Sequence, residues 1–208
     1  MRNELMTKKI KWAACAVMSI LLVTGCSAAK LPEGDVKVVN QQMSGVIDLL
    51  LKSANYGEDQ STVESVLLPT GSSYEIKMVV DQYESGELVN TIEVPNYTTD
   101  EMEKNSLVHL ILNVGKDDVK SILTIAEVDQ EKTTDDKNPE YKLVKTETPA
   151  INFEKRVTLE QYGGELGKEF VLAAYTTGGS SDINLETYQD EIANYDTASI
   201  VKVTITEK

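Results

Sequence analysis

The chain has 208 residues, of which 20 are basic and 34 acidic, so its formal net charge at pH 7 is −14. This excess of negative charge repels phosphates and anionic lipid headgroups, which argues against nucleic-acid binding and against electrostatic adsorption to a membrane. The sequence holds one His and two Cys, so a His-dependent catalytic system has a single candidate residue.

Residues 1–25 have the pattern of an export signal. Arg2 and three lysines precede an apolar run over residues 12–23, which is shorter than the roughly 20 residues that a helix needs to span a bilayer. A short apolar run after a basic segment predicts a cleavable signal rather than a permanent transmembrane helix.

The apolar run ends in Val23-Thr24-Gly25-Cys26, which resembles the lipobox of bacterial lipoproteins. The resemblance implies that Cys26 takes a diacylglyceryl group and that cleavage between Gly25 and Cys26 makes Cys26 the new N-terminus. Two acyl chains hold a protein firmly on a bilayer, whereas one does not. We therefore expect a lipid anchor on the extracytoplasmic face of the bacterial cell membrane and no cofactor other than this lipid, with an ordinary secretory signal as the alternative.

Cleavage would change the composition of the mature chain. Removal of residues 1–25 takes away four basic residues and one acidic residue, which changes the net charge from −14 to −17. Cys15 and Trp12 would also be lost, so the mature chain could form no internal disulfide. Without Trp it is also a poor candidate for carbohydrate binding on a large aromatic platform.

The segment after Cys26 is polar. Residues 26–42 contain Pro32 and Gly34 and are predicted to be a flexible tether, although residues 36–39 could instead be a first strand of the domain. Residues 43–208 are then expected to form a single β-rich domain of a size that supports one hydrophobic core.

Alternation of apolar and polar residues dominates the rest of the chain. Tyr74, Ile76, Met78 and Val80 alternate with polar residues, and the pattern resumes after a turn, which predicts a β-hairpin over residues 74–94. Further strands are expected over the remaining alternating or apolar segments, which are 63–68, 107–114, 121–128, 141–146, 151–158, 170–176 and 201–205. Residues 46–52 suit a strand or a helix turn.

Two segments have helical features. Leu185, Tyr188 and Ile192 follow Asp182 at helical spacing, so a short helix is expected over residues 183–194, and a helical turn is expected over residues 99–104. The whole pattern predicts an all-β, mainly antiparallel fold. We expect a β-sandwich or a partly open barrel of about 8–10 strands with at most one or two short helices.

Residues 74–208 also resemble uncharacterised domains in lipoproteins of Gram-positive bacteria. The resemblance lies in Tyr74-Glu75-Ile76, in the turn over residues 83–86, in residues 168–175 and in the closing strand. It implies an all-β extracytoplasmic module and carries no activity with it.

Three features are candidate sites. His109 alternates with apolar strand residues, so we interpret it as a packed histidine rather than as a catalytic or metal-ligating one. The acidic stretch 129–140 lacks the ligand order and the central glycine of an EF-hand and is expected to be a solvated loop, with weak cation binding as the alternative. The small hydroxyl-rich turn is the candidate partner surface, which consists of Thr177, Gly178, Gly179, Ser180, Ser181 and Asp182.

The sequence therefore favours a membrane-anchored extracytoplasmic lipoprotein that carries a non-catalytic binding, sensing or interaction module, with an envelope protein as a possible partner. An envelope hydrolase that uses carboxylates is one alternative, since acids are abundant. A solute-binding lipoprotein of a transporter is another. No motif in the sequence identifies a catalytic or metal-binding residue.

Overall fold

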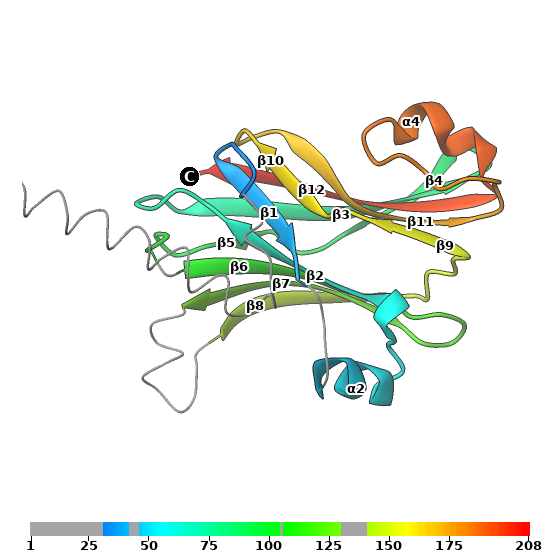
Figure 1. The fold of residues 1–208 in the computed structure, drawn as a ribbon, viewed down its shortest axis with the longest axis horizontal. Coiled ribbons are helices and arrows are strands. Elements are labelled where there is room, and N and C mark those ends of the chain that lie inside the picture. Colours follow the sequence, from blue (N-terminus) through cyan, green and yellow to red (C-terminus); the bar gives the residue numbers. More distant parts are fainter. Residues whose placement is uncertain (1–30, 42–45, 105, 130–140) are drawn as a thin grey trace, which may run out of the picture. The chain divides into compact units, whose positions relative to one another are not determined.

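Strands that pair in antiparallel order make up most of the chain in the computed structural model, which describes residues 31–41, 46–104, 106–129 and 141–208. Pro32–Lys208 forms one compact unit. Figure 1 shows two sheets as two layers of this unit. The expected all-β antiparallel fold is confirmed, and the two-sheet alternative is the one observed.

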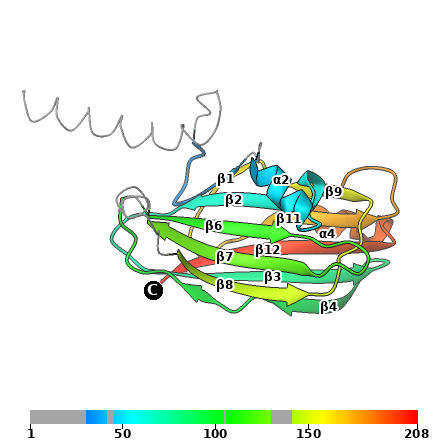
Figure 2. The ribbon, with the colours of Figure 1, turned by 90° about the horizontal axis from the view of Figure 1, so that it is seen from below.

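The first sheet has six strands, and every pairing in it is antiparallel. Four of these strands run side by side in Figure 2, where β2, β6, β7 and β8 follow one another. Their spatial order is β10 (Gln161–Gly164), β1 (Val36–Asn40), β2 (Ser61–Leu67), β6 (Ser106–Asn113), β7 (Ser121–Asp129) and β8 (Tyr141–Thr148).

The second sheet also has six strands and is antiparallel throughout. Five of them follow the order β4 (Glu87–Glu93), β3 (Tyr74–Glu84), β12 (Thr197–Glu207), β11 (Glu169–Thr177) and β9 (Lys155–Thr158), and β5 (Tyr97–Thr98) pairs with the other end of β3. The hairpin predicted over residues 74–94 is confirmed as β3 and β4, which turn at Ser85 and Gly86.

The main core lies between the two sheets. Tyr74, Ile76, Met78 and Val80 are all buried on the inner face of β3, as the alternation predicted. They face a similar set from the first sheet, which includes Val108, Leu110, Leu112, Leu123 and Ile125. At about 25 cal/mol per Å² of buried apolar surface, this interior is the main source of stability. Tyr97 also joins the sheets, because its hydroxyl donates to Glu127 Oε2 at 2.8 Å.

Three local expectations need correction, and one open alternative is decided. Residues 46–52, which suited a strand or a helix turn, lie in helix α2 (Val46–Ser53), followed by the 3₁₀ turn η1 (Glu58–Gln60). The described residues 99–104 contain no helical turn. The helix expected over 183–194 is confined to α4 (Tyr188–Glu191) and the 3₁₀ turn η2 (Ile192–Asn194). Strand formation in 151–158 begins only at Lys155.

The predicted tether over residues 26–42 is also too long. β1 lies within it and pairs with β10 on one side and with β2 on the other. Val36 and Val38 are buried in the main core, because apolar residues two positions apart face the same side of a strand. The alternative reading of residues 36–39 as a first strand is therefore the correct one, and the sheet begins before residue 43.

A candidate ligand pocket beside the β11–β12 connection

Residues 178–196, here called the β11–β12 connection, build a second apolar cluster on the outer face of the second sheet. Tyr188 and Ile192 are both buried and lie one helical turn apart in α4 and η2. They pack with Ile183 and Tyr195 of the connection against small or branched side chains of β11 and β12, which are Ala174, Ala198 and Ile200. The connection is therefore held on the sheet by apolar contacts.

A charged group lies on the same outer face. Lys202 Nζ is 2.7 Å from Asp81 Oδ2 and 3.4 Å from Glu169 Oε2, and its side chain is only 15% exposed. Thr91 donates a hydrogen bond of 2.7 Å to the other Asp81 oxygen. Burial opposes the charged form of Lys202, but the Asp81 hydrogen bond and the charge of Glu169 outweigh burial and raise the pKa of Lys202.

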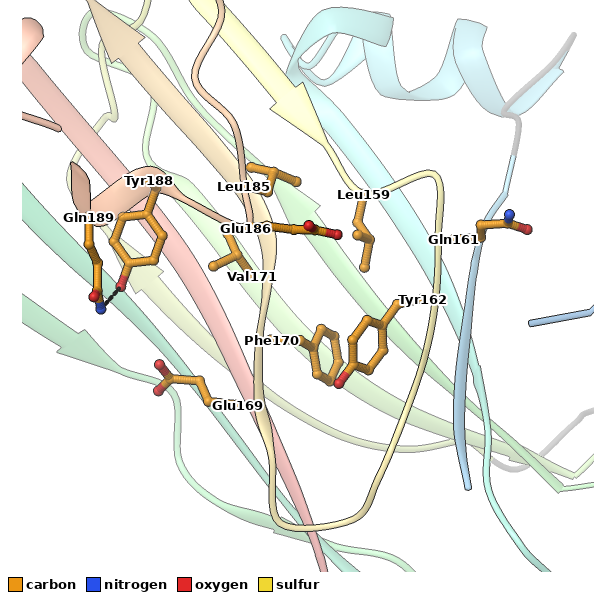
Figure 3. Close-up of a pocket in the computed structure, with 10 residues that line it drawn as sticks. All are labelled: Leu159, Gln161, Tyr162, Glu169, Phe170, Val171, Leu185, Glu186, Tyr188 and Gln189. Carbon is orange, nitrogen blue, oxygen red and sulfur yellow. Dashed lines mark hydrogen bonds between the residues drawn. The ribbon is translucent and has the colours of Figure 1, made fainter. Parts of the chain in front are cut away.

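A pocket of about 460 Å³ borders this group, and the ten residues labelled in Figure 3 line it. Three chain segments meet there: the link from β9 into β10, the start of β11, and the β11–β12 connection. β9 pairs with Ala173–Thr176 of β11. The chain then leaves the second sheet and joins the first sheet as β10. The pocket lies where the β9–β11 pairing and the β1–β10 pairing diverge.

Aromatic rings form one wall of the pocket. Tyr162 of β10 stacks on Phe170 of β11, with ring centroids 4.5 Å apart and an angle of 18° between the planes. Burial raises the pKa of Tyr162, and the charge of Glu165 adds to this effect. The position of Tyr162 depends on Gly163, because a Cβ there would lie 2.0 Å from the carbonyl oxygen of Glu33. The close crossing of the two backbones therefore requires glycine.

The remaining lining is half apolar and half polar. Leu159, Val171 and Leu185 provide the apolar part, and Figure 3 shows the Glu186 side chain extending from the connection toward Leu159. Glu169 lies across the pocket from Glu186, near Tyr188. The polar part is completed by Gln161 and by Gln189, whose Nε2 donates to the Tyr188 hydroxyl at 3.4 Å. A volume of this size and a mixed lining are typical of small-molecule sites.

The predicted partner surface, residues 177–182, begins at the far end of β11 from Glu169 and provides none of the pocket lining. Thr177 ends β11, and its Oγ1 is 2.7 Å from Thr197 Oγ1. Gly178 and Gly179 have φ of 68° and 72° and lie close to Asp196 and Tyr195. Lys155 Nζ donates to the carbonyl oxygens of Gly179 and Ser181. Ser180, Ser181 and Asp182 are exposed, so this turn is tied through its backbone and leaves these side chains at the surface.

The other predicted sites provide less evidence of a function. Gly25, Cys26 and the acidic residues 130–140 lie outside the described residues. His109 is half-buried on the outer face of β6, its Nδ1 is 3.1 Å from Ser65 Oγ, and burial lowers its pKa. Among the described residues, no group of three His, Cys, Asp or Glu side chains could hold a metal ion. No helix in the described ranges is long and apolar enough to cross a membrane.

A second polar group lies between the sheets, away from the pocket. Glu64 of β2 is fully buried on the inner face, and Asn40 Nδ2 donates to its Oε1 at 2.5 Å. Its Oε2 has no hydrogen-bond partner among the described residues. Arg156 Nη1 donates nearby to the Ser61 carbonyl oxygen and to Thr62 Oγ1. Burial raises the pKa of Glu64 to about 8, although the Asn40 hydrogen bond and the Arg156 charge oppose this shift.

The pocket was not anticipated from the sequence. The spacing of Leu185, Tyr188 and Ile192 predicted only a short helix. Leu185 and Tyr188 line the pocket, and Leu159 and Tyr162 provide the opposite wall. Those residues carry no distinctive motif, and only the strand order brings them to the connection.

Comparisons of the chain with protein-family models, with curated proteins and with solved structures found no match. The assignment of function therefore depends on the residues and the geometry described above.

Proposed function

We propose that this protein is a bacterial lipoprotein that is anchored by Cys26 on the extracytoplasmic face of the cell membrane, where its β-sandwich binds a small ligand. The pocket formed by Tyr162, Phe170 and the β11–β12 connection is the observation that carries the binding function. The basic and apolar segments before Val23-Thr24-Gly25-Cys26 support the anchor.

Binding rather than catalysis fits the chemistry of the pocket lining. Its ionisable groups are two carboxylates and two tyrosines, and the nearby Lys202 is already paired with Asp81 and Glu169. The mixed lining is suited to hold a ligand by shape, apolar contact and a few polar groups.

The anchor is tested by labelling cells with a fatty acid that can be detected on proteins. The wild-type chain and a Cys15→Ala variant should both incorporate the label and sediment with membranes, because Cys15 lies in the segment that would be removed. Cys26→Ala should lose the label and should accumulate as precursor or be released. A Cys26→Ala variant that still carries the label and partitions normally would refute the anchor.

The extracytoplasmic location is tested separately. Protease is added to cells whose layers outside the cytoplasmic membrane have been made permeable, while that membrane stays intact. The domain should be digested, whereas a cytoplasmic marker protein should survive. Protection equal to that of the marker would contradict the extracytoplasmic location.

A further inference from the structure

The charge of the pocket restricts which ligands it can accept. Glu169 and Glu186 are the charged residues of the lining, and both carry carboxylates. Lys202 lies beside the pocket, but Asp81 at 2.7 Å and Glu169 at 3.4 Å already neutralise it. An anionic ligand would therefore meet net repulsion, which the overall charge of −14 would increase.

The apolar half of the lining restricts the ligand further. Leu159, Val171 and Leu185 would lie against any occupant, and a bare metal ion could not use such surface, since it prefers several oxygen ligands. A neutral apolar molecule would contact the apolar residues, but it would remove water from the Glu186 carboxylate without replacing the lost hydrogen bonds. The ligand must therefore combine an apolar body with a group that can pair with a carboxylate.

The aromatic rings favour a positively charged group as the part of the ligand that pairs with the carboxylate. Tyr162, Phe170 and Tyr188 border the pocket, and the faces of such rings attract ammonium and guanidinium groups. A hydrogen bond to a charged carboxylate is also about twice as strong as one between neutral groups. We propose that the pocket binds an organic cation, in which an ammonium group is carried on an apolar or aromatic body.

The volume sets the size of this ligand. A pocket of about 460 Å³ accommodates about 15 water-sized groups at roughly 30 Å³ each. This corresponds to an arylalkyl amine or a similar small amine. The inference rests on the proposed binding function of the same pocket.

The test uses three probes of nearly equal shape: 2-phenylethylammonium, the neutral 2-phenylethanol and the anionic phenylacetate. Binding to the purified domain is followed by calorimetry and by protein-observed NMR. The cation should bind at least about tenfold more tightly than either other probe, which is the ratio expected from one charge-assisted hydrogen bond. Its affinity should fall as salt is added, and the NMR shifts should lie at the pocket residues.

Two variants of equal charge provide the control. Glu186→Gln should reduce the affinity for the cation about tenfold and should leave the affinity for 2-phenylethanol unchanged. Asp190→Asn removes a carboxylate from α4 that does not line the pocket, and it should stay within about twofold of the wild type. Both side chains are exposed, and circular dichroism with thermal melting should confirm that both variants fold.

The outcomes separate this inference from the proposed function. If 2-phenylethanol or phenylacetate binds in the pocket as tightly as the cation, the inference of a cationic ligand is overturned and the pocket remains a binding site. If Asp190→Asn weakens binding as much as Glu186→Gln, the inference is overturned, since the effect is then one of net charge. If none of the probes binds, both the inference and the binding function fail.

Discussion

Lys202 Nζ lies 2.7 Å from Asp81 Oδ2 on the outer face of the second sheet, and the two side chains are only 15% and 9% exposed. Outer faces of antiparallel sheets are usually open to water, but here the β11–β12 connection packs on the same face as the pair. Because both side chains are buried, removing one charge would leave the other without a partner and away from water. The stability of the sheet at this ion pair therefore depends on the segment that packs on the same face and forms one wall of the pocket.

The first prediction concerns this ion pair. Lys202→Met should lower the free energy of unfolding by about 3 kcal/mol, because it leaves the Asp81 carboxylate buried without a countercharge. The double variant Lys202→Met with Asp81→Leu should recover much of this loss. Urea denaturation measures both effects.

The matched control is Lys77→Met. Lys77 Nζ of β3 is 3.4 Å from Glu93 Oε1 of β4, but those side chains are 50% and 65% exposed, so the cost should be below about 1 kcal/mol. Equal costs for Lys202→Met and Lys77→Met would contradict the argument from burial.

The second prediction concerns the pH dependence of stability through Glu64. Its folded-state pKa of about 8 lies above the ordinary value of 4.5, so its contribution to stability is fully present below pH 4.5. As pH rises from there to about 8, the unfolded chain gives up this proton and the folded chain keeps it. Stability should therefore fall over this window, by at most about 1.4 kcal/mol per pH unit.

Glu64→Gln tests this prediction because glutamine does not titrate and still offers an acceptor to Asn40 Nδ2. The variant should lack the Glu64 part of the slope and should gain stability relative to the wild type as pH rises from 5 to 8. Glu87→Gln on the exposed strand β4 is the control and should keep the wild-type slope. A constant difference between Glu64→Gln and the wild type across this range would disprove the elevated pKa.

The third prediction concerns the turn between β3 and β4. Gly86 has φ of +87°, and a Cβ there would lie 2.9 Å from the Cβ of Ala193 in η2. Gly167 has φ of +77° with nothing within 4 Å of the same position. Gly167→Ala should cost about 1 kcal/mol for the left-handed backbone alone, and Gly86→Ala should cost about 1 kcal/mol more, because the turn must also move away from η2.

Thermal or chemical unfolding of the two variants checks this difference directly. If both substitutions cost the same, the hairpin turn does not press on the β11–β12 connection in solution. The expected excess for Gly86→Ala would instead show that the hairpin supports the connection.

A strand could be predicted from the sequence where its own residues show an alternating or apolar pattern. The alternation of Tyr74, Ile76, Met78 and Val80 marks the buried face of β3. The apolar runs of β6, β7 and β11 also mark strands, and β11 is buried on both faces over most of its length. β10 gave no such signal, because Gln161-Tyr162-Gly163-Gly164 has little apolar content. It pairs because β1 offers it an edge and because glycine lets another backbone approach closely.

The pocket and the buried charges were less predictable, since both depend on contacts between distant residues. Asp81 was correctly placed on the polar side of β3, but burial on that side arises only because residues 183–195 fold back over the sheet. Glu64 alternates with Thr62 and Val66 as a buried-face residue would, but a glutamate in that position is ordinarily read as solvent-facing. Local pattern cannot reveal what a later segment covers.

The position of β1 has a mechanical consequence for an anchored protein. In the proposed lipoprotein, any drag on the domain is transmitted from the lipid along the chain to β1, which is the first strand after the anchor. β1 is bonded along both edges, to β10 and to β2. A load along this strand must therefore shear two ladders together instead of peeling one edge strand away, so the attachment point is among the parts of the fold most resistant to pulling.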